Sequence, residues 1–216
     1  IKEHYQILDE LIKQNKQNNV RLRYNSNLSV LGYKGTSIIE YWKKFNNIQL
    51  GISIDDINKP AEYARSGTIW PTIEDNYKII TRQCPHIKID VTSTFSIYNA
   101  FNLTKLQHLW ITSGKINARN LSLELLTTPN YISVQLLPKP YKEKLTVLIT
   151  EHINFLKAYN CTQLIELWNK AMIFLNASDR SFDLHKFFKY NDALDKCRDE
   201  SFEQIYPEYI NLRKHS

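Results

Sequence analysis

A hydroxyl, a carboxylate and an arginine lie close together in residues 51–76, GISIDDINKPAEYARSGTIWPTIEDN. Ser53 and Asp55 stand two positions apart in a predicted strand, so their side chains share one face. Arg65 follows in a predicted loop. A carboxylate beside a hydroxyl suits a ribose or an amino group, and an arginine fork suits a carboxylate. The segment predicts a polar ligand site at the end of a strand, with simple pairing of Arg65 and Glu62 as the alternative.

The elements that position these residues alternate along the chain. Apolar alternation predicts four strands, at 20–25, 48–55, 87–95 and 132–137. Helical spacing and capping signals predict helices at 3–17, from Ser37 to near Phe45, from Pro71 to about Gln83, and at 102–112, 141–158, 162–176 and 184–198, with a short capped turn at Ser201. Residues 114–130 are polar and predicted to be irregular. Repeated strand–helix alternation favours an α/β fold with a parallel sheet.

The predicted strands have one apolar and one polar face. In 87–95, Ile89 and Val91 point one way, whereas Lys88 and Asp90 point the other. Strands buried on both faces of a parallel sheet are almost wholly apolar. If helices cover the apolar faces, the polar faces look into a shared space, as in a wide or partly open barrel around a polar ligand. An antiparallel sheet with one solvated face is the alternative.

Composition excludes several classes of protein. The chain has 216 residues, of which 43% are hydrophobic and 23% are charged, which is ordinary for a globular protein. Its longest apolar runs are too short for a membrane span. The net charge of +6 is spread out, so nucleic acid is not an expected partner. Three widely spaced cysteines, Cys84, Cys161 and Cys197, argue against a disulfide framework or a zinc site and favour a reducing cytoplasm.

The order of several motifs resembles one enzyme family. Residues 51–76 resemble the stretch after the fourth strand of radical S-adenosylmethionine (radical SAM) enzymes, typically SID-G…EY-R-G…W-I--N. Upstream, Asn25-Ser26-Asn27-Leu28-Ser29 is similar to the family's NTN-T motif. Downstream, TSTFSIYNAFNL, LLTTPNYISVQLLP and DRSFDLHKFFKYNDALDKCRDESFEQIYPEY resemble a twitch-type subfamily common in phage and bacterial genomes. The resemblance covers nearly the whole chain.

The resemblance implies a partial (βα)6 TIM-like barrel, with about four parallel strands over residues 1–158 and a C-terminal helical extension over 159–216. The family's CxxxCxxC motif, which binds a [4Fe–4S] cluster, is absent. The chain is therefore expected to be the C-terminal three-quarters of a radical SAM protein, without the first two βα units and the N-terminal cluster-binding segment. S-adenosylmethionine (AdoMet) and the cluster are implied for the full-length protein, and neither is expected for this chain alone.

Carried over residue by residue, the resemblance implies a set of cofactor-binding side chains. Ser53 and Asp55 would approach the ribose or the methionyl amine of AdoMet, and Arg65 would meet its carboxylate. Residues near cofactor or substrate would be Asn25 and Asn27 after the third strand, Ser96 and Asn99 after the fifth, and Gln135 in the sixth. For the asparagines, closing a turn is the alternative.

The implied function is reductive cleavage of AdoMet at the cluster, followed by hydrogen abstraction from a substrate, a peptide or protein by family analogy. The alternative is a non-catalytic basic α/β module with a binding or scaffold role. No residue is assigned to catalysis or to a metal. Near the C-terminus, Asp195 and Arg198 are three residues apart on a predicted helix, and an ion pair between them is expected.

Overall fold

The alternation in the sequence reappears in the sheet. In the computed structural model, which describes residues 2–215, every second residue of β4 (Ile48–Ser53) is buried and the intervening ones are half-buried. The second half of β5 (Lys88–Phe95) repeats this pattern. The strands therefore have an apolar face and a partly accessible polar face.

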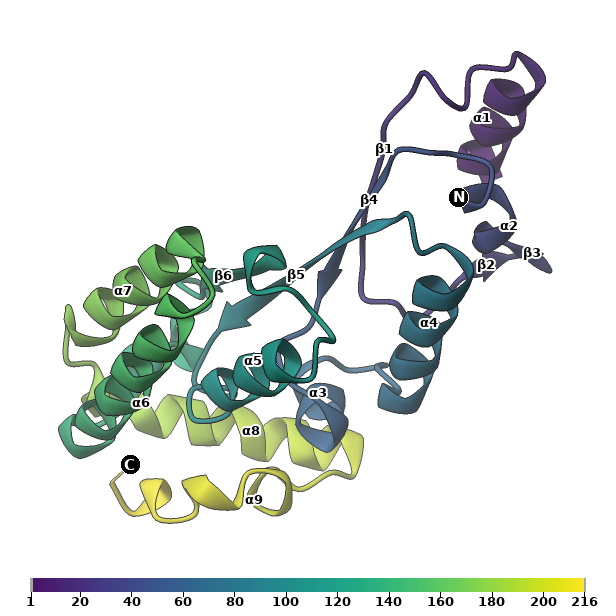
Figure 1. Cartoon of the computed structure of the whole chain (residues 1–216). Coiled ribbons are helices and arrows are strands. Elements are labelled where there is room, and N and C mark those ends of the chain that lie inside the picture. The colour runs from purple at the N-terminus through teal and green to yellow at the C-terminus, as the bar shows by residue number, and fades with distance from the viewer. Residues whose placement is uncertain (1, 216) are drawn as a thin grey trace. The chain divides into compact units, whose positions relative to one another are not determined.

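Four of the described strands form one sheet, in the order β1 (Leu22–Ser26), β4, β5 and β6 (Leu121–Leu125) (Figure 1). β1 and β4 pair in parallel along the whole of β1. β5 and β6 also end together, because the Leu126 N–H donates to the Phe95 carbonyl at 3.1 Å. Helices lie in the crossovers, as parallel neighbours require. The predicted α/β fold with about four parallel strands is confirmed, and the antiparallel alternative is wrong.

The chain packs as two compact units, and β5 passes from one into the other. The first comprises Ile1–Ser53 and Thr68–Val91, and the second comprises Ile54–Gly67 and Thr92–Ser216. The expected domain boundary after residue 158 lies inside the second unit and stays a prediction.

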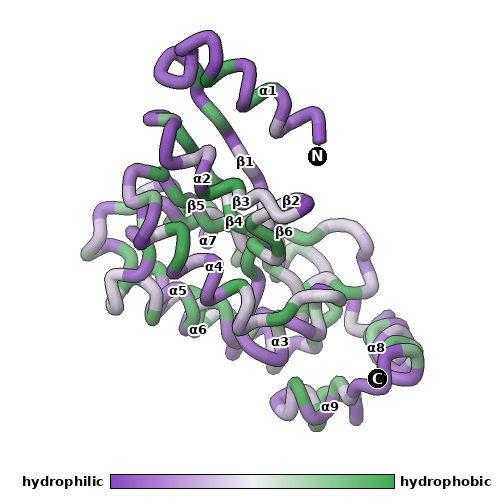
Figure 2. Tube along the Cα trace, turned by 90° about the vertical axis from the view of Figure 1, so that its right-hand side faces the viewer, coloured by the Kyte–Doolittle hydropathy of each residue, from purple (hydrophilic) through white to green (hydrophobic). Residues whose placement is uncertain are grey.

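The first unit joins β1 and β4 to three helices and a short hairpin. Its helices are α1 (Lys2–Lys13), α2 (Ile38–Trp42) and α4 (Trp70–Gln83), and its hairpin pairs β2 (Gly32–Tyr33) with β3 (Thr36–Ser37). As predicted, Ser37 caps α2, with its hydroxyl accepting the Ile39 N–H at 3.3 Å. α1 is largely hydrophilic (Figure 2) and buries Leu8 alone among its described residues.

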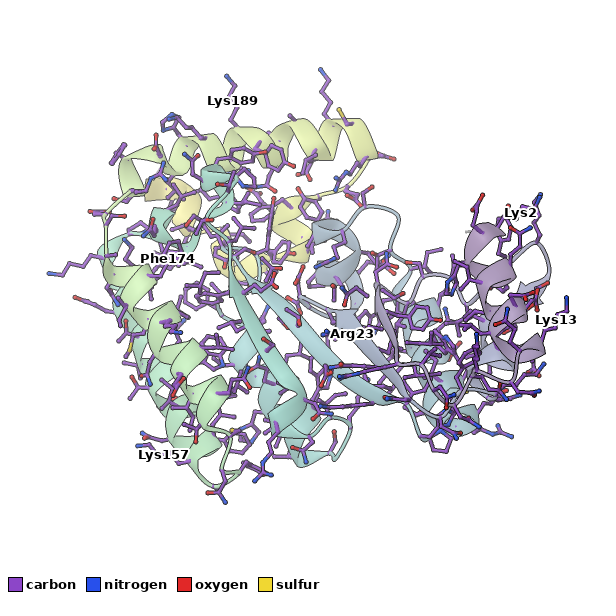
Figure 3. The ribbon with its side chains drawn as sticks, turned by 90° about the horizontal axis from the view of Figure 1, so that it is seen from above. Lys2, Lys13, Arg23, Lys157, Phe174 and Lys189 are labelled. Carbon is purple, nitrogen blue, oxygen red and sulfur yellow. The ribbon has the colours of Figure 1, made fainter. Side chains whose placement is uncertain are left out.

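The second unit is mostly helical. Its α-helices are α3 (Asn58–Ala64), α5 (Leu103–Thr112), α6 (Lys139–Lys157), α7 (Thr162–Asn176), α8 (Leu184–Arg198) and α9 (Phe202–Ile205). α6 and α7 lie side by side (Figure 1), and the fully buried Trp168 of α7 packs edge-on against Phe95 of β5. Lys157 and Lys189 point from α6 and α8 into solvent (Figure 3), so part of the positive charge lies on solvated helix faces.

The predicted strand at 132–137 is wrong. These residues form two 3-10 turns, Asn130–Ile132 and Val134–Leu136, and the Ser133 hydroxyl accepts the Gln135 N–H at 3.3 Å. Such local side-chain bonds offer the backbone an alternative to a sheet ladder. The real strand is β6, inside the segment predicted to be irregular.

A second difference concerns residues before Arg65. They were expected to form a loop, but Asn58–Ala64 form α3, and the Arg65 N–H closes its last turn on the Ala61 carbonyl at 3.1 Å. Asn58 begins the helix at a positive φ of 54°, a conformation that asparagine tolerates better than most residues. Arg65 is therefore held by a helix end.

None of the helices in the described chain is long and apolar enough to cross a membrane.

Candidate functional site

The second unit contains a cavity of about 260 Å³ where β4 and β5 end. Its polar lining includes four of the predicted residues, Asp55, Arg65, Ser96 and Asn99. Tyr206 reaches its wall from the C-terminal segment, about 140 residues farther along the chain than Arg65. The cavity lies where the carboxyl ends of strands commonly place ligands in α/β proteins.

An ion pair between Arg65 and Asp55 forms the charged part of the cavity wall. The Arg65 Nε–H donates to Asp55 Oδ2 at 2.7 Å, and the Thr94 N–H donates to Asp55 Oδ1 at 2.7 Å. Glu62 instead pairs with Lys59 at 2.7 Å, so the alternative pairing of Arg65 with Glu62 is wrong. Among the described residues, nothing accepts a hydrogen bond from the terminal nitrogens of Arg65, whose side chain is 36% exposed. They remain available to a ligand.

Asn99 ties the two strand ends together. Its Oδ1 accepts the Ser96 N–H at 3.0 Å, and its Nδ2 donates to the carbonyls of Asp55 and Thr94, each at 2.9 Å. Asn99 is 1% exposed, and both amide atoms are engaged within the protein. It therefore positions Asp55, which agrees with the structural alternative for this asparagine.

Tyrosines supply the other wall of the cavity and link it to α8. The Tyr98 hydroxyl donates to Asn191 Oδ1 at 2.8 Å, and the Tyr63 hydroxyl donates to the same oxygen at 3.0 Å and to Asp195 Oδ1 at 2.8 Å. Burial, the largest cause, raises the pKa of Tyr63 and of Tyr98 well above 10, so both stay neutral donors. Tyr63 lies two residues before Arg65, and α8 thus fixes the segment that carries the arginine.

The expected ion pair between Asp195 and Arg198 does not form. Asp195 accepts the Tyr63 hydroxyl and the Phe202 N–H at 2.9 Å. Arg198 Nη1 donates to the Tyr63 carbonyl at 3.0 Å. Tyr63 thus contacts α8 twice, through its hydroxyl with Asp195 and through its carbonyl with Arg198. These two hydrogen bonds attach α3 to α8.

Replacing Asn191 with leucine is expected to lower the free energy of unfolding by about 2 kcal/mol, because the buried Tyr98 hydroxyl loses its acceptor while the side-chain volume is kept. Urea denaturation measures the effect, with the exposed Asn154→Leu as the matched control. Asn191→Asp retains an acceptor oxygen and is expected to lose less. Equal stability of Asn191→Leu and wild type would show that the tyrosine hydroxyls do not depend on this residue.

The remaining predicted residues lie elsewhere. Gln135 is not in a strand, as was expected; it lies in a 3-10 turn, and its amide donates to the Phe174 carbonyl at 2.8 Å. Ser53, Asn25 and Asn27 belong to the first unit. Asn27 closes a turn by accepting the Ser29 N–H at 3.1 Å, as the structural alternative for it stated. The Asn25 side chain lies over Gly51, where an added Cβ would stand 2.5 Å from its Oδ1.

Asp56 also lines the cavity and was not singled out from the sequence. The residue is 5% exposed, and burial, only partly offset by hydrogen bonds from Ile57 and Asn102, raises its pKa from 3.8 to about 6. A titratable group with a shifted pKa beside a cavity is a common mark of a functional site. The signal for it in the sequence is the second carboxylate of Ile54-Asp55-Asp56, whereas the prediction from the strand pattern concerned Asp55.

The cysteines of the described chain do not fit an iron–sulfur cluster. Such a cluster is held by cysteine thiolates, whereas Cys84 and Cys161 are buried and burial raises the pKa of each thiol. Cys197 is exposed. Within residues 2–215, His, Cys, Asp and Glu do not gather in threes or more around a point where a metal ion could bind.

Comparison with known proteins gives a distant match. Two solved structures of native anSMEcpe with bound AdoMet resemble the chain, one with the Cp18Cys peptide at 15% identity and one with the Kp18Cys peptide at 16%. Each match covers 73% of this chain and 44% of the other, with a TM-score of 0.49. The chain thus spans less than half of those proteins. No protein-family profile and no curated protein matches it.

Proposed function

We propose that the cavity beside Asp55 and Arg65 binds AdoMet, and that the chain is the cofactor-positioning part of a radical SAM enzyme. The observation that carries the proposal is the Arg65–Asp55 pair: Nε is anchored at 2.7 Å, and the terminal nitrogens have no partner in the described chain. An anchored guanidinium is oriented to receive a carboxylate through two parallel bonds. The motif order that resembles the family supplies the identity of the ligand.

The other groups at the cavity suit the remaining polar atoms of AdoMet. Asp55 accepts one hydrogen bond on each oxygen, so each retains a lone pair for a ribose hydroxyl or the methionyl ammonium. Asn99 holds the backbone of this residue by donating to the Asp55 carbonyl, and the Thr94 N–H holds its carboxylate by donating to Oδ1. The aromatic rings of Tyr98 and Tyr206 form part of the cavity wall and would exclude water from that side of the ligand.

In the family that the sequence resembles, bound AdoMet supplies a radical that abstracts hydrogen from substrate. The described residues of this chain bind and orient; they do not fit the cluster, and we assign them no step of the radical chemistry. A peptide or protein remains the expected class of substrate.

Arg65→Met is expected to weaken AdoMet binding about tenfold to a hundredfold, the effect of losing a charge-assisted bidentate contact. Isothermal titration of AdoMet into the chain measures it. Arg65→Lys keeps the charge but lacks the fork of the guanidinium. Its affinity for AdoMet is expected to lie between those of the wild type and Arg65→Met.

The matched control is Arg213→Gln, which removes an arginine of similar side-chain exposure, 33%, that also pairs with an aspartate, Asp192, in the second unit. Its AdoMet affinity should equal that of the wild type. If Arg65→Met and wild type bind AdoMet equally, the proposed role of Arg65 is wrong. If the wild type does not bind AdoMet, the alternative of a non-catalytic module is favoured.

A further inference from the structure

Asp56 lines a second cavity in the second unit, of about 300 Å³. One side of this cavity is formed by the segment after β4, with Asp56, Ile57 and Pro60. The other is formed by α5, with Lys105, Leu106 and Leu109. The accessible lining is largely apolar, and its polar residues are Asp56, Asn58, Asn102 and Lys105.

The Asp56 carboxylate is only half satisfied by the protein. Its Oδ1 accepts the Ile57 N–H at 2.8 Å. Its Oδ2 is buried and, among the described residues, has no hydrogen-bond partner. Leaving a buried carboxylate oxygen without a donor is costly. A native structure that keeps such an atom in a residue that lines a cavity favours a donor from outside the chain.

The charges around Asp56 favour a cationic donor. Glu208 and Asp55 both lie near enough to raise the pKa of Asp56 by repulsion, after the larger effect of burial. Asn102, the residue before α5, donates to Glu208 at 3.3 Å, and it also lies close enough to Asp56 to lower that pKa, without a hydrogen bond of normal length to Oδ2. Lys105 is the cation of the lining, and its side chain is exposed, without an ion pair in the described chain.

We propose that this second cavity binds a primary ammonium group at the end of a short aliphatic chain, with the ammonium on Asp56 and the methylenes against Pro60, Leu106 and Leu109. An ammonium carries three donors and a compact charge, which match an unpaired carboxylate oxygen. A metal ion fits less well, because His, Cys, Asp and Glu do not cluster in threes within residues 2–215. A lysine side chain of a polypeptide and a free alkylamine share this chemistry. The inference concerns the second cavity, although Asp56 lines both, and its test uses no AdoMet.

Butylammonium and its neutral analogue 1-butanol are the probes, titrated into the isotope-labelled chain while the methyl resonances of Leu106 and Leu109 are followed by NMR. We expect butylammonium to shift these resonances and to bind at least tenfold more tightly than 1-butanol. Asp56→Asn should lose at least tenfold in affinity for butylammonium, and Glu166→Gln, which removes an exposed acid on α7, should lose none. Lys105→Met should bind at least as tightly as wild type, because it removes a competing cation.

N-acetyl-lysine methylamide, run in parallel, distinguishes the two sources: tighter binding than butylammonium assigns the site to a polypeptide lysine, and weaker binding assigns it to a free amine. Asp56→Asn keeps its shape and its acceptor for Ile57, and its unfolding curve shows that it is folded under the titration conditions. The proposal is overturned if 1-butanol binds as tightly as butylammonium, if Asp56→Asn binds like wild type, or if no probe shifts the Leu106 and Leu109 resonances.

Discussion

Asp56→Asn is expected to raise the free energy of unfolding by about 3 kcal/mol at pH 8 and by less than about 1 kcal/mol at pH 4. Burial raises the pKa of this carboxyl from 3.8 to about 6, so the folded state holds its proton more tightly than the unfolded state. Above pH 6 the folded protein carries a buried charge that costs stability. As the pH falls from 6 towards 3.8, folding takes up a proton and that cost disappears.

Urea denaturation of wild type and Asp56→Asn at several pH values between 4 and 8 measures this difference. Besides burial, the acids Glu208 and Asp55 raise the pKa of Asp56, whereas hydrogen bonds from Ile57 and Asn102 lower it. Tyr206 and Tyr209 stay neutral because burial raises the pKa of each. Glu166→Gln serves as the exposed control and should change stability little at any pH. A difference between Asp56→Asn and wild type that stays constant from pH 4 to 8 would contradict the burial of a titrating carboxyl here.

The second large effect has the opposite sign and comes from His152. Its pKa falls from 6.5 to about 4, first because it is buried and second because His108 is near. His152 Nε2 and Trp168 Nε1 both lie 2.9 Å from Gln107 Oε1, so the neutral imidazole donates to this oxygen. Stability from neutral His152 is complete above pH 6.5 and is lost as the pH falls to 4, by about 3 kcal/mol.

Because the Asp56 and His152 effects oppose each other over the same pH range, the histidine is best tested in the Asp56→Asn background. There, the free energy of unfolding should fall by about 3 kcal/mol more between pH 7 and pH 4 with His152 than with His152→Gln, which keeps a donor but does not titrate. Urea denaturation at the two pH values decides it. Parallel curves for the two proteins would mean that His152 is not held neutral.

Periodic elements were predictable because their signals are local. The apolar alternation of β4 and β5 and the serine cap of α2 are each written within a few residues. Residues 132–137 show where prediction from a local pattern fails. Ile132, Val134 and Leu136 alternate like a strand, yet Ser133 bonds its own neighbour and the chain turns. Helix α3 lies in a segment predicted to be a loop; it contains Pro60 in its first turn, where proline is tolerated.

The residues of the candidate site also fall into two groups: those that a local motif marks and those that only long-range contacts bring together. Asp55 and Arg65 could be singled out because a short motif carries both, and the structure pairs them at 2.7 Å. The contributions of Tyr98, Asn191 and Tyr206 depend on contacts between segments about 90 to 150 residues apart, and no local pattern marks such contacts. Gln135 failed as a site residue because its role followed from a strand that does not exist.

The claim that Arg65 receives the methionyl carboxylate is tested most directly by combining a change in the ligand with a change in the protein. AdoMet and decarboxylated AdoMet are titrated into wild type and Arg65→Met, which gives a double-mutant cycle. The account predicts that wild type binds AdoMet at least about tenfold more tightly than the decarboxylated form, and that Arg65→Met binds both alike. Equal affinity of wild type for the two ligands, or equal discrimination by both proteins, would contradict it.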